Sequence, residues 1–383
     1  MQPLRIALLC GAEDSETDAI ISYSSRLAAA LNSSISMSAT VFRLIAPGRW
    51  REHSKGQRGS AGIPSGFDAY VLQYNPFSFG RRGMAPWLPL AWRRLRDHNA
   101  ALMVITVHEA YMPLVGWRWT TMGLWHRAQL WALLGATDFT IATCREREDE
   151  IAALGGRHVR GDHIPVGSNL DEVVDIAHVA ALRASLRGPQ SLPIIATFGN
   201  AHPSRAMSML HLALHAVAGS VGEHVLLNLG ARPPRVVPPL GVEVVTPGPL
   251  TTAQVAAHLS CADLVLLPYV TGAITNKTTL MASLQMGRAV LSTYGPSTDD
   301  ELLDPGLLLV SIDDPEKYAA EAVRLIRDDD EREVLARRGR ELYERTFSWE
   351  TIAAQTRSAL SALARGSARG VGVSCAQADT FGQ

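Results

Sequence analysis

The sequence has little that would hold a metal ion or a disulfide framework. Its four cysteines, Cys10, Cys144, Cys261 and Cys375, lie far apart and form no CxxC pair. This spacing favours reduced thiols in a cytoplasmic protein. No Asp-x-Asp follows an expected strand, and the acidic runs at 299–300 and 328–330 fall in expected loops or helices. We therefore expect no metal site.

Long apolar runs and a large excess of charge are missing as well. No stretch approaches the roughly 18 uninterrupted apolar residues that a membrane-spanning helix needs. The chain begins directly with a strand-like segment, so we expect no signal peptide. A net charge of -1 argues against a nucleic-acid-binding protein. The 47% hydrophobic content over 383 residues suits a globular protein with two domains.

Short apolar runs alternate with longer segments of helical period. "RIALLC", "SATVFRLI", "AYVLQY", "ALMVITV" and "FTIAT" are typical of buried strands, and a second series begins at "IIATFG" and continues through "HVLLNLG", "VEVV", "DLVLLPY", "AVLST" and "LLLVS". Strands that alternate with helices predict doubly wound parallel sheets. Because the series restarts once, we expect an α/β protein of two such domains with a cleft between them.

The expected boundaries follow from this pattern. We assign residues 1–185 to an N-terminal domain, 186–346 to a C-terminal domain, and 347–365 to a final helix. Residues 366–383 are small and polar, and we expect them to be disordered. Ligands of open α/β sheets bind beyond the carboxyl ends of the strands, so the loops after the strands are where a site is expected.

One of only three lysines in the chain stands where a helix is expected to begin. Lys277, in "ITNKTTLMASL", follows the strand "DLVLLPY" and a Thr-Gly turn. A helix N-terminus has unpaired N–H groups and a partial positive charge, so with a lysine it suits a phosphate. The residues alone leave a second interpretation open: Asn276 or Thr278 caps the helix and Lys277 is solvated.

Two further loops follow strands in a similar way. In "ATFGNAHPSRAM" a strand ends at Gly199 and Arg205 falls in the expected first turn of the next helix, where a cation is tolerated best beside an anion. In "VITVHEAY", His108 and Glu109 directly follow a buried strand of the first domain. A surface arginine and a structural histidine are the alternatives. The turn "HIPVGSNL", which contains Asn169, is by itself a plain turn.

Taken together, these segments resemble the retaining GT-B glycosyltransferases that use nucleotide sugars, of the glycosyltransferase family 4-like kind. The resemblance covers roughly residues 4–362 and rests on "DAIISYSSRLAAAL", "VITVHEAYMPL", "HIPVGSNL", "FGNAHPSR", "CADLVLLPY", "MASLQMGRAVLST" and "FSWETIAAQ". It implies two Rossmann-like domains, a nucleotide-sugar donor as substrate, no cofactor and no metal ion. It also implies that the final helix crosses back to the first domain.

The resemblance also assigns roles to residues. It places His108 in the catalytic cleft beside the transferred sugar, with Glu109 and Asn169 on the sugar and acceptor side. Gly11 and Asp18 match the first-domain loop that approaches the sugar and acceptor. The diphosphate is expected to meet the following residues: Gly199, Asn200, Arg205, Asn276, Lys277 and Thr278.

The sequence departs from the family at three of these places. Asn200 stands where the family usually has an arginine, and Ile274 and Ala282 stand where it usually has two glutamates that contact the donor sugar and the ribose. We interpret Lys277 as the cation that replaces the missing arginine. A nucleotide-sugar epimerase of the same fold remains an alternative function, and so does a non-catalytic partner protein, which the missing glutamates favour.

The acceptor side of the sequence is rich in tryptophan and arginine. Six of the eight tryptophans lie between residues 87 and 131, and we expect most of them in the core. Five arginines between 81 and 96, interleaved with Trp87, Leu88, Leu90 and Trp92, leave two hypotheses: a solvated helix face, or a peripheral contact with an anionic inner-membrane surface. A small molecule, a glycan and a lipid-linked compound are all compatible acceptors.

Overall fold

The structure is a computed structural model that describes residues 3–12, 19–54, 61–155, 159–170, 174–189 and 191–375, with side chains up to residue 365. Its contacts divide the chain into two compact units, Met1–Pro165 with Trp349–Gln383, and Val166–Ser348. The boundary therefore falls after Pro165 and not near residue 186 as expected. The reason is α5 (Ile176–Arg187), whose Arg183 and Arg187 pair with Asp263 of the second unit.

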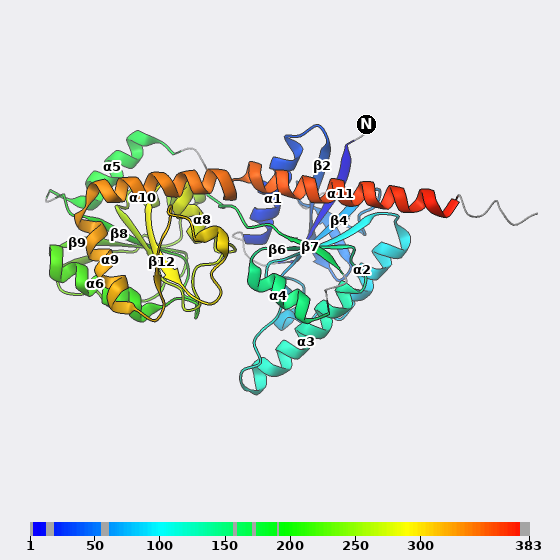
Figure 1. Cartoon of the computed structure of the whole chain (residues 1–383), viewed down its shortest axis with the longest axis horizontal. Helices are drawn as coiled ribbons and strands as arrows, with labels where there is room; N and C mark the ends of the chain where they lie inside the picture. Colours follow the sequence, from blue (N-terminus) through cyan, green and yellow to red (C-terminus); the bar gives the residue numbers. More distant parts are fainter. Residues whose placement is uncertain are drawn as a thin grey trace, which may run out of the picture. The chain divides into compact units, whose positions relative to one another are not determined.

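The first unit contains a seven-stranded sheet in the order β3-β2-β1-β4-β5-β6-β7. Only β3 runs antiparallel to its neighbour. The strands are β1 (Leu4–Cys10), β2 (Met37–Ala46), β3 (Arg49–Glu52), β4 (Ala69–Tyr74), β5 (Leu102–Val107), β6 (Phe139–Ala142) and β7 (Arg160–His163). The helices are α1 (Ala19–Asn32), α2 (Trp87–His98), α3 (Gly116–Leu134), α4 (Arg145–Ala153) and α11 (Trp349–Cys375), drawn in Figure 1.

The second unit contains a six-stranded, wholly parallel sheet in the order β10-β9-β8-β11-β12-β13, which is the strand order of a Rossmann sheet. Its strands are β8 (Ile194–Phe198), β9 (His224–Leu229), β10 (Val242–Val245), β11 (Leu264–Leu267), β12 (Ala289–Tyr294) and β13 (Leu308–Ser311). The remaining helices are α6 (Met207–Val221), α7 (Thr252–Ser260), α8 (Thr278–Gln285), α9 (Pro315–Arg327) and α10 (Asp329–Leu342). The order reverses between β8 and β11, and ligands bind at such a switch point.

The central strands of each sheet are almost continuously apolar and buried. In β1 the segment Ile6–Cys10 is fully buried, as a strand covered by helices on both faces requires. Helices α6 and α9 lie side by side in the second unit (Figure 1). Tyr318, Ala322 and Leu325 of α9 recur at helical spacing and are buried in the core of that unit.

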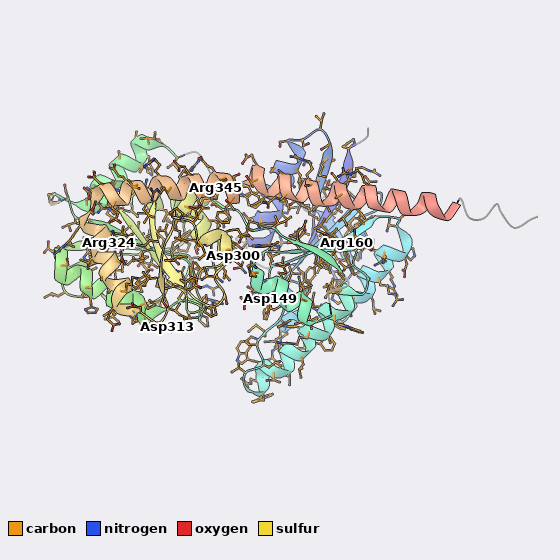
Figure 2. All side chains as sticks on the ribbon, in the orientation of Figure 1. Asp149, Arg160, Asp300, Asp313, Arg324 and Arg345 are labelled. Atoms are coloured by element: carbon orange, nitrogen blue, oxygen red, sulfur yellow. The ribbon has the colours of Figure 1, made fainter. Side chains whose placement is uncertain are left out.

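The final helix belongs to the first unit and packs on α1, where the Tyr23 ring lies 5.2 Å from that of Trp349. It continues to Cys375, past residue 366, where the sequence led us to expect the loss of regular structure. Residues 376–383 lie outside the described residues. Two residues labelled in Figure 2 form surface ion pairs, Arg324 with Glu321 (2.6 Å) and Arg345 with Asp304 (2.7 Å). Exposed pairs of this kind contribute little to stability.

Candidate active site

The switch point of the second sheet begins with Gly199, directly after β8. Its N–H donates to the carbonyl of Leu229 (2.9 Å), and its φ of 123° lies in the region that favours glycine. A Cβ on Gly199 would collide with the guanidinium of Arg205 and come within 3.1 Å of the Thr279 methyl group. A glycine is therefore needed here, because Arg205 and the start of α8 both approach the backbone.

Arg205 packs against Gly199, and only 9% of Arg205 is exposed. Its Nη2 donates to the Phe198 carbonyl, and its guanidinium carbon lies 5.3 Å from the ring centre of Tyr269. Its Nη1 is buried and has no hydrogen-bond partner among the described residues. The sequence placed Arg205 in the first turn of the helix, but α6 begins at Met207, so Arg205 belongs to the preceding loop.

The N-terminus of α8 lies next to the same tyrosine ring. Lys277 is the residue immediately before α8, and its Nζ lies 6.0 Å from the centre of the Tyr269 ring. Its side chain does not cap the helix, and the Asn276 side-chain oxygen is buried without a hydrogen bond in the described part of the chain. Tyr269 also bonds through its hydroxyl to the Thr279 hydroxyl (3.1 Å).

A buried carboxylate holds the turn that leads into α8. Asp299 is fully buried and accepts hydrogen bonds from both the backbone N–H (2.6 Å) and the hydroxyl (2.8 Å) of Thr275. Charge-assisted bonds of this kind are short and strong. They fix the backbone two residues before Lys277, so the start of α8 is built rigidly.

The structure thus brings together most of the residues expected at the diphosphate. Gly199, Arg205, Lys277 and the start of α8 surround Tyr269 at the carboxyl edge of the second sheet. The Asn200 side-chain oxygen accepts the Arg232 N–H (2.8 Å), and this bond ties two loops together.

Two positions are apolar and buried where the glycosyltransferases that the sequence resembles usually have glutamates. Ile274 is 3% exposed and Ala282 is fully buried, so neither contributes a polar group to this edge of the sheet. Thr278 is the first residue of α8. Its backbone N–H is among the first N–H groups of that helix, which have no partner within the helix.

In the first unit, His108 follows β5 at the carboxyl edge of the sheet. Its backbone N–H donates to the Tyr74 carbonyl (2.9 Å), its ring packs edge-on against Tyr23 at 4.9 Å, and its Nε2 lies 2.9 Å from the Gln73 side-chain oxygen. An amide oxygen only accepts hydrogen bonds, so Nε2 carries the proton and Nδ1 keeps its lone pair. Burial lowers the pKa of His108 to about 4, so the ring is neutral at pH 7.

Glu109 is engaged by an arginine. The guanidinium of Arg147, which is almost buried, pairs with Glu109 (2.9 Å) and Glu150, and its Nε lies 3.4 Å from the His108 carbonyl. Burial alone would lower the pKa of Arg147, but the surrounding carboxylates raise it above its usual value. Arg147 therefore stays charged and anchors the segment that carries His108 and Glu109.

Three further residues were expected on the sugar and acceptor side: Gly11, Asp18 and Asn169. Gly11 follows β1 and packs against Ser78, whose carbonyl accepts the Ala12 N–H (2.7 Å), and a Cβ on Gly11 would collide with that carbonyl. Asp18 lies outside the described residues. Asn169 is half-buried and belongs to the second unit, not the first.

Sequence reasoning missed the residues that hold these groups in place. Tyr269 ends the run "DLVLLPY" and carried no separate signal, although an aromatic residue at a strand end beside two cations is a recognisable pattern. Gln73 lies within the buried strand β4, and nothing in the sequence indicates that its side chain contacts His108. Within the described ranges, no three His, Cys, Asp or Glu side chains are grouped so that they could hold a metal ion.

Comparisons with known proteins identify the architecture. No protein-family model matches the sequence, and a search of curated proteins finds no match. A sucrose-phosphate synthase from Thermosynechococcus elongatus is similar over 94% of this chain and 98% of its own, with a TM-score of 0.66 and 18% identity. The chain has the GT-B fold.

Two further solved structures share this fold. Anabaena HepE in complex with UDP and glucose covers 94% of this chain and 100% of its own, at a TM-score of 0.61 and 12% identity. A glycosyltransferase from Rickettsia africae is similar over 94% of this chain and 98% of its own, with a TM-score of 0.62 and 10% sequence identity. At such identities the likeness establishes the fold alone. In the described part of this chain, no helix is long and apolar enough to cross a membrane.

Proposed function

We propose that the protein is a glycosyltransferase that transfers a sugar from a nucleoside diphosphate sugar to an acceptor, with retention of configuration and without a metal ion. One observation carries the proposal. Arg205 and Lys277 flank Tyr269 at the switch point of the second sheet, beside the N-terminus of α8. Two cations and a helix N-terminus match the charge of a diphosphate.

The buried Nη1 of Arg205 supports this assignment further. A buried donor without a partner costs roughly 1–3 kcal/mol, and a phosphate oxygen would satisfy it with a charge-assisted bond. A structure of the same fold, HepE, has been obtained with UDP-glucose. The shared fold favours a nucleotide sugar as the ligand of this protein. The position of Arg205 and Lys277 around Tyr269 is independent support, because it is observed in this chain itself.

The proposed chemistry builds negative charge on the leaving diphosphate. Arg205, Lys277 and the first N–H groups of α8 would stabilise this charge, and groups of this kind typically contribute roughly 3–4 kcal/mol each. These cations would do the work that a metal ion does in other transferases. The leaving phosphate would take the acceptor proton, so no general base is required.

His108 would orient the sugar. Its ring is neutral and Nε2 is held by Gln73, so Nδ1 is available to accept a hydrogen bond from a sugar hydroxyl. An imidazole fixed in one tautomer is suited to positioning a substrate and poorly suited to removing a proton at neutral pH, since its pKa of about 4 makes it a weak base.

A non-catalytic partner protein is the second candidate, and Ile274 and Ala282 favour it. Both are buried apolar residues where the family usually has glutamates. The two functions differ in one measurable property. A transferase releases nucleoside diphosphate when an acceptor is present, and a non-catalytic protein binds the nucleotide without releasing product.

Binding is tested first by calorimetry with a panel of nucleoside diphosphates. We expect at least one to bind, and Lys277→Ala to weaken it about tenfold or more, because a charge-assisted contact contributes roughly 1.5–3 kcal/mol. The matched control is Lys317→Ala, which removes an exposed lysine from α9 of the same unit. Equal affinity in the two variants, or no binding by the wild type, would refute the proposed site.

A further inference from the structure

Helix α3 has an apolar face that the rest of its unit leaves open. Trp117, Leu124 and Trp131 are spaced seven residues apart, so they lie along one side of the helix, and they are 75%, 54% and 65% exposed. The opposite side is buried and includes His126 and Leu130. The expectation that most of the clustered tryptophans pack in the core is therefore wrong.

Further exposed apolar residues lie near this face. Trp125 is adjacent to Leu124 in α3, Leu114 and Val115 come directly before the helix, and Figure 1 shows the first end of α3 projecting away from the strands of its own unit. Single exposed apolar residues are ordinary, but three large ones in line on one side of a helix, as Trp117, Leu124 and Trp131 are, indicate an interaction surface.

The segments that form α2 and α3 contain arginines and no acidic residues from the start of β4 to Arg96 or around α3. Residues 69–96 and 110–137 contain no Asp or Glu. Arg118 is exposed beside Trp117, with its guanidinium 5.3 Å from that ring, and on α2 Arg93 and Arg94 are exposed. Arg93 lines the same surface hollow as Trp131. Among the described residues none of these three arginines has an acidic partner.

We propose that the exposed face of α3, with Arg93, Arg94 and Arg118, docks on the surface of an anionic lipid bilayer. Tryptophan is favoured at the boundary between lipid and water, where its apolar ring is buried and its N–H stays hydrated. Each arginine near an anionic surface adds to the attraction. Apolar and basic residues on one face are the pattern of a helix that lies in the membrane interface.

The proposed lipid contact is centred on α3, whereas the sequence suggested residues 81–96 for it. Within 81–96, Leu88 and Trp92 are buried and Trp87 is half-buried, so the apolar side of α2 faces the core. Only Leu90 among these apolar residues is well exposed. The arginines of α2 therefore supply charge, and α3 supplies the apolar contact.

A second copy of the chain is a less suitable partner for this face. A symmetric dimer through α3 would place the same arginine-rich surroundings opposite each other. Like charges across an interface disfavour association, whereas phosphate headgroups complement them. The charge of the face thus selects an anionic surface over a copy of itself.

The test is co-sedimentation of the full chain with vesicles of equal parts phosphatidylcholine and phosphatidylglycerol, and with vesicles of phosphatidylcholine alone. We expect binding to the anionic vesicles that weakens as salt is added. Replacing both Trp117 and Trp131 with serine should weaken binding at least about tenfold, while phenylalanine at both positions should retain most of it. Arg93→Gln with Arg94→Gln should weaken it by about fivefold per arginine.

Leu240→Ser is the matched control, because Leu240 is a fully exposed apolar residue of the second unit. Thermal unfolding and nucleoside-diphosphate binding check that each variant is folded. The proposal fails if the wild type does not sediment with anionic vesicles, or if the serine variant binds as the wild type does. It also fails if light scattering finds a dimer that the serine variant converts to a monomer without any vesicle binding.

Discussion

The neutral state of His108 has a consequence for stability that can be measured without any substrate. In the folded chain burial lowers its pKa to about 4, compared with 6.5 for the free side chain. Between these values the unfolded chain binds a proton that the folded chain does not. Stability therefore falls as the pH is lowered through this window. Above pH 6.5 the contribution of the neutral ring is fully present.

The size of the effect follows from the pKa difference. About 2.5 units correspond to about 3 kcal/mol, which is an upper value because His108 is half-buried and part of the residue is open to solvent. His108→Gln removes the titrating group and keeps a side chain that can bond to Gln73. We expect the wild type to lose up to about 3 kcal/mol more stability than the variant between pH 7 and pH 4.

Urea unfolding of both proteins at several pH values measures this difference. Other buried histidines, His126 and His224, also have lowered pKa values because of burial, but they are the same in both proteins and cancel. The same substitution at exposed His178 is the matched control. If wild type and His108→Gln lose stability in parallel, His108 is not held neutral, and its proposed role as a fixed hydrogen-bond acceptor is wrong.

Four further predictions concern the two sheet edges. His108→Ala should reduce acceptor-dependent release of nucleoside diphosphate about a hundredfold with nearly unchanged nucleotide affinity, and near-normal turnover would remove it from the site. Arg205→Ala should weaken nucleotide binding about tenfold or more because a charge-assisted contact is lost, so an unchanged dissociation constant would contradict us. Gly199→Ala should destabilise the fold by roughly 1–3 kcal/mol because of its positive φ and the Arg205 contact, whereas Gly219→Ala in α6, with open space around it, should not. Turnover should survive EDTA, and activity that returns only with added magnesium or manganese would refute metal independence.

The arrangement of the sheets could be predicted from the sequence because it depends on local pattern. Buried parallel strands such as β5 are continuous apolar runs bounded by turns, and this signal does not require knowledge of the partners. The carboxyl edge of each sheet then follows from topology alone. For this reason His108, Gly199 and Lys277 could be singled out by position, although their contacts could not.

The errors arose where the outcome depends on packing between segments far apart in the chain. The domain boundary was set by Arg183 and Arg187 reaching Asp263, across about 80 residues of sequence. The helix period of residues 116–134 is weak, so nothing local indicated that Trp117 and Trp131 face outward. Tertiary packing decides which face of such a helix is covered.

The burial of Ile274 and Ala282 explains why these positions do not carry glutamates. Ala282 is fully buried in α8 and Ile274 is buried before it, so a carboxylate at either position would be taken from water into the core. An unpaired buried charge is strongly unfavourable. A single substitution would therefore not restore the family pattern.

The chain has instead concentrated positive charge at this edge. Asp299 is the carboxylate buried next to the turn, and by accepting the N–H and hydroxyl of Thr275 it fixes the backbone before Lys277. On the proposed assignment, a site with two cations and without those carboxylates would bind a diphosphate mainly through charge and make few directed contacts to the sugar. We therefore expect the affinity of the protein for nucleoside diphosphate and for the corresponding nucleotide sugar to differ little, which calorimetry with both ligands measures, and a large difference would contradict this assignment.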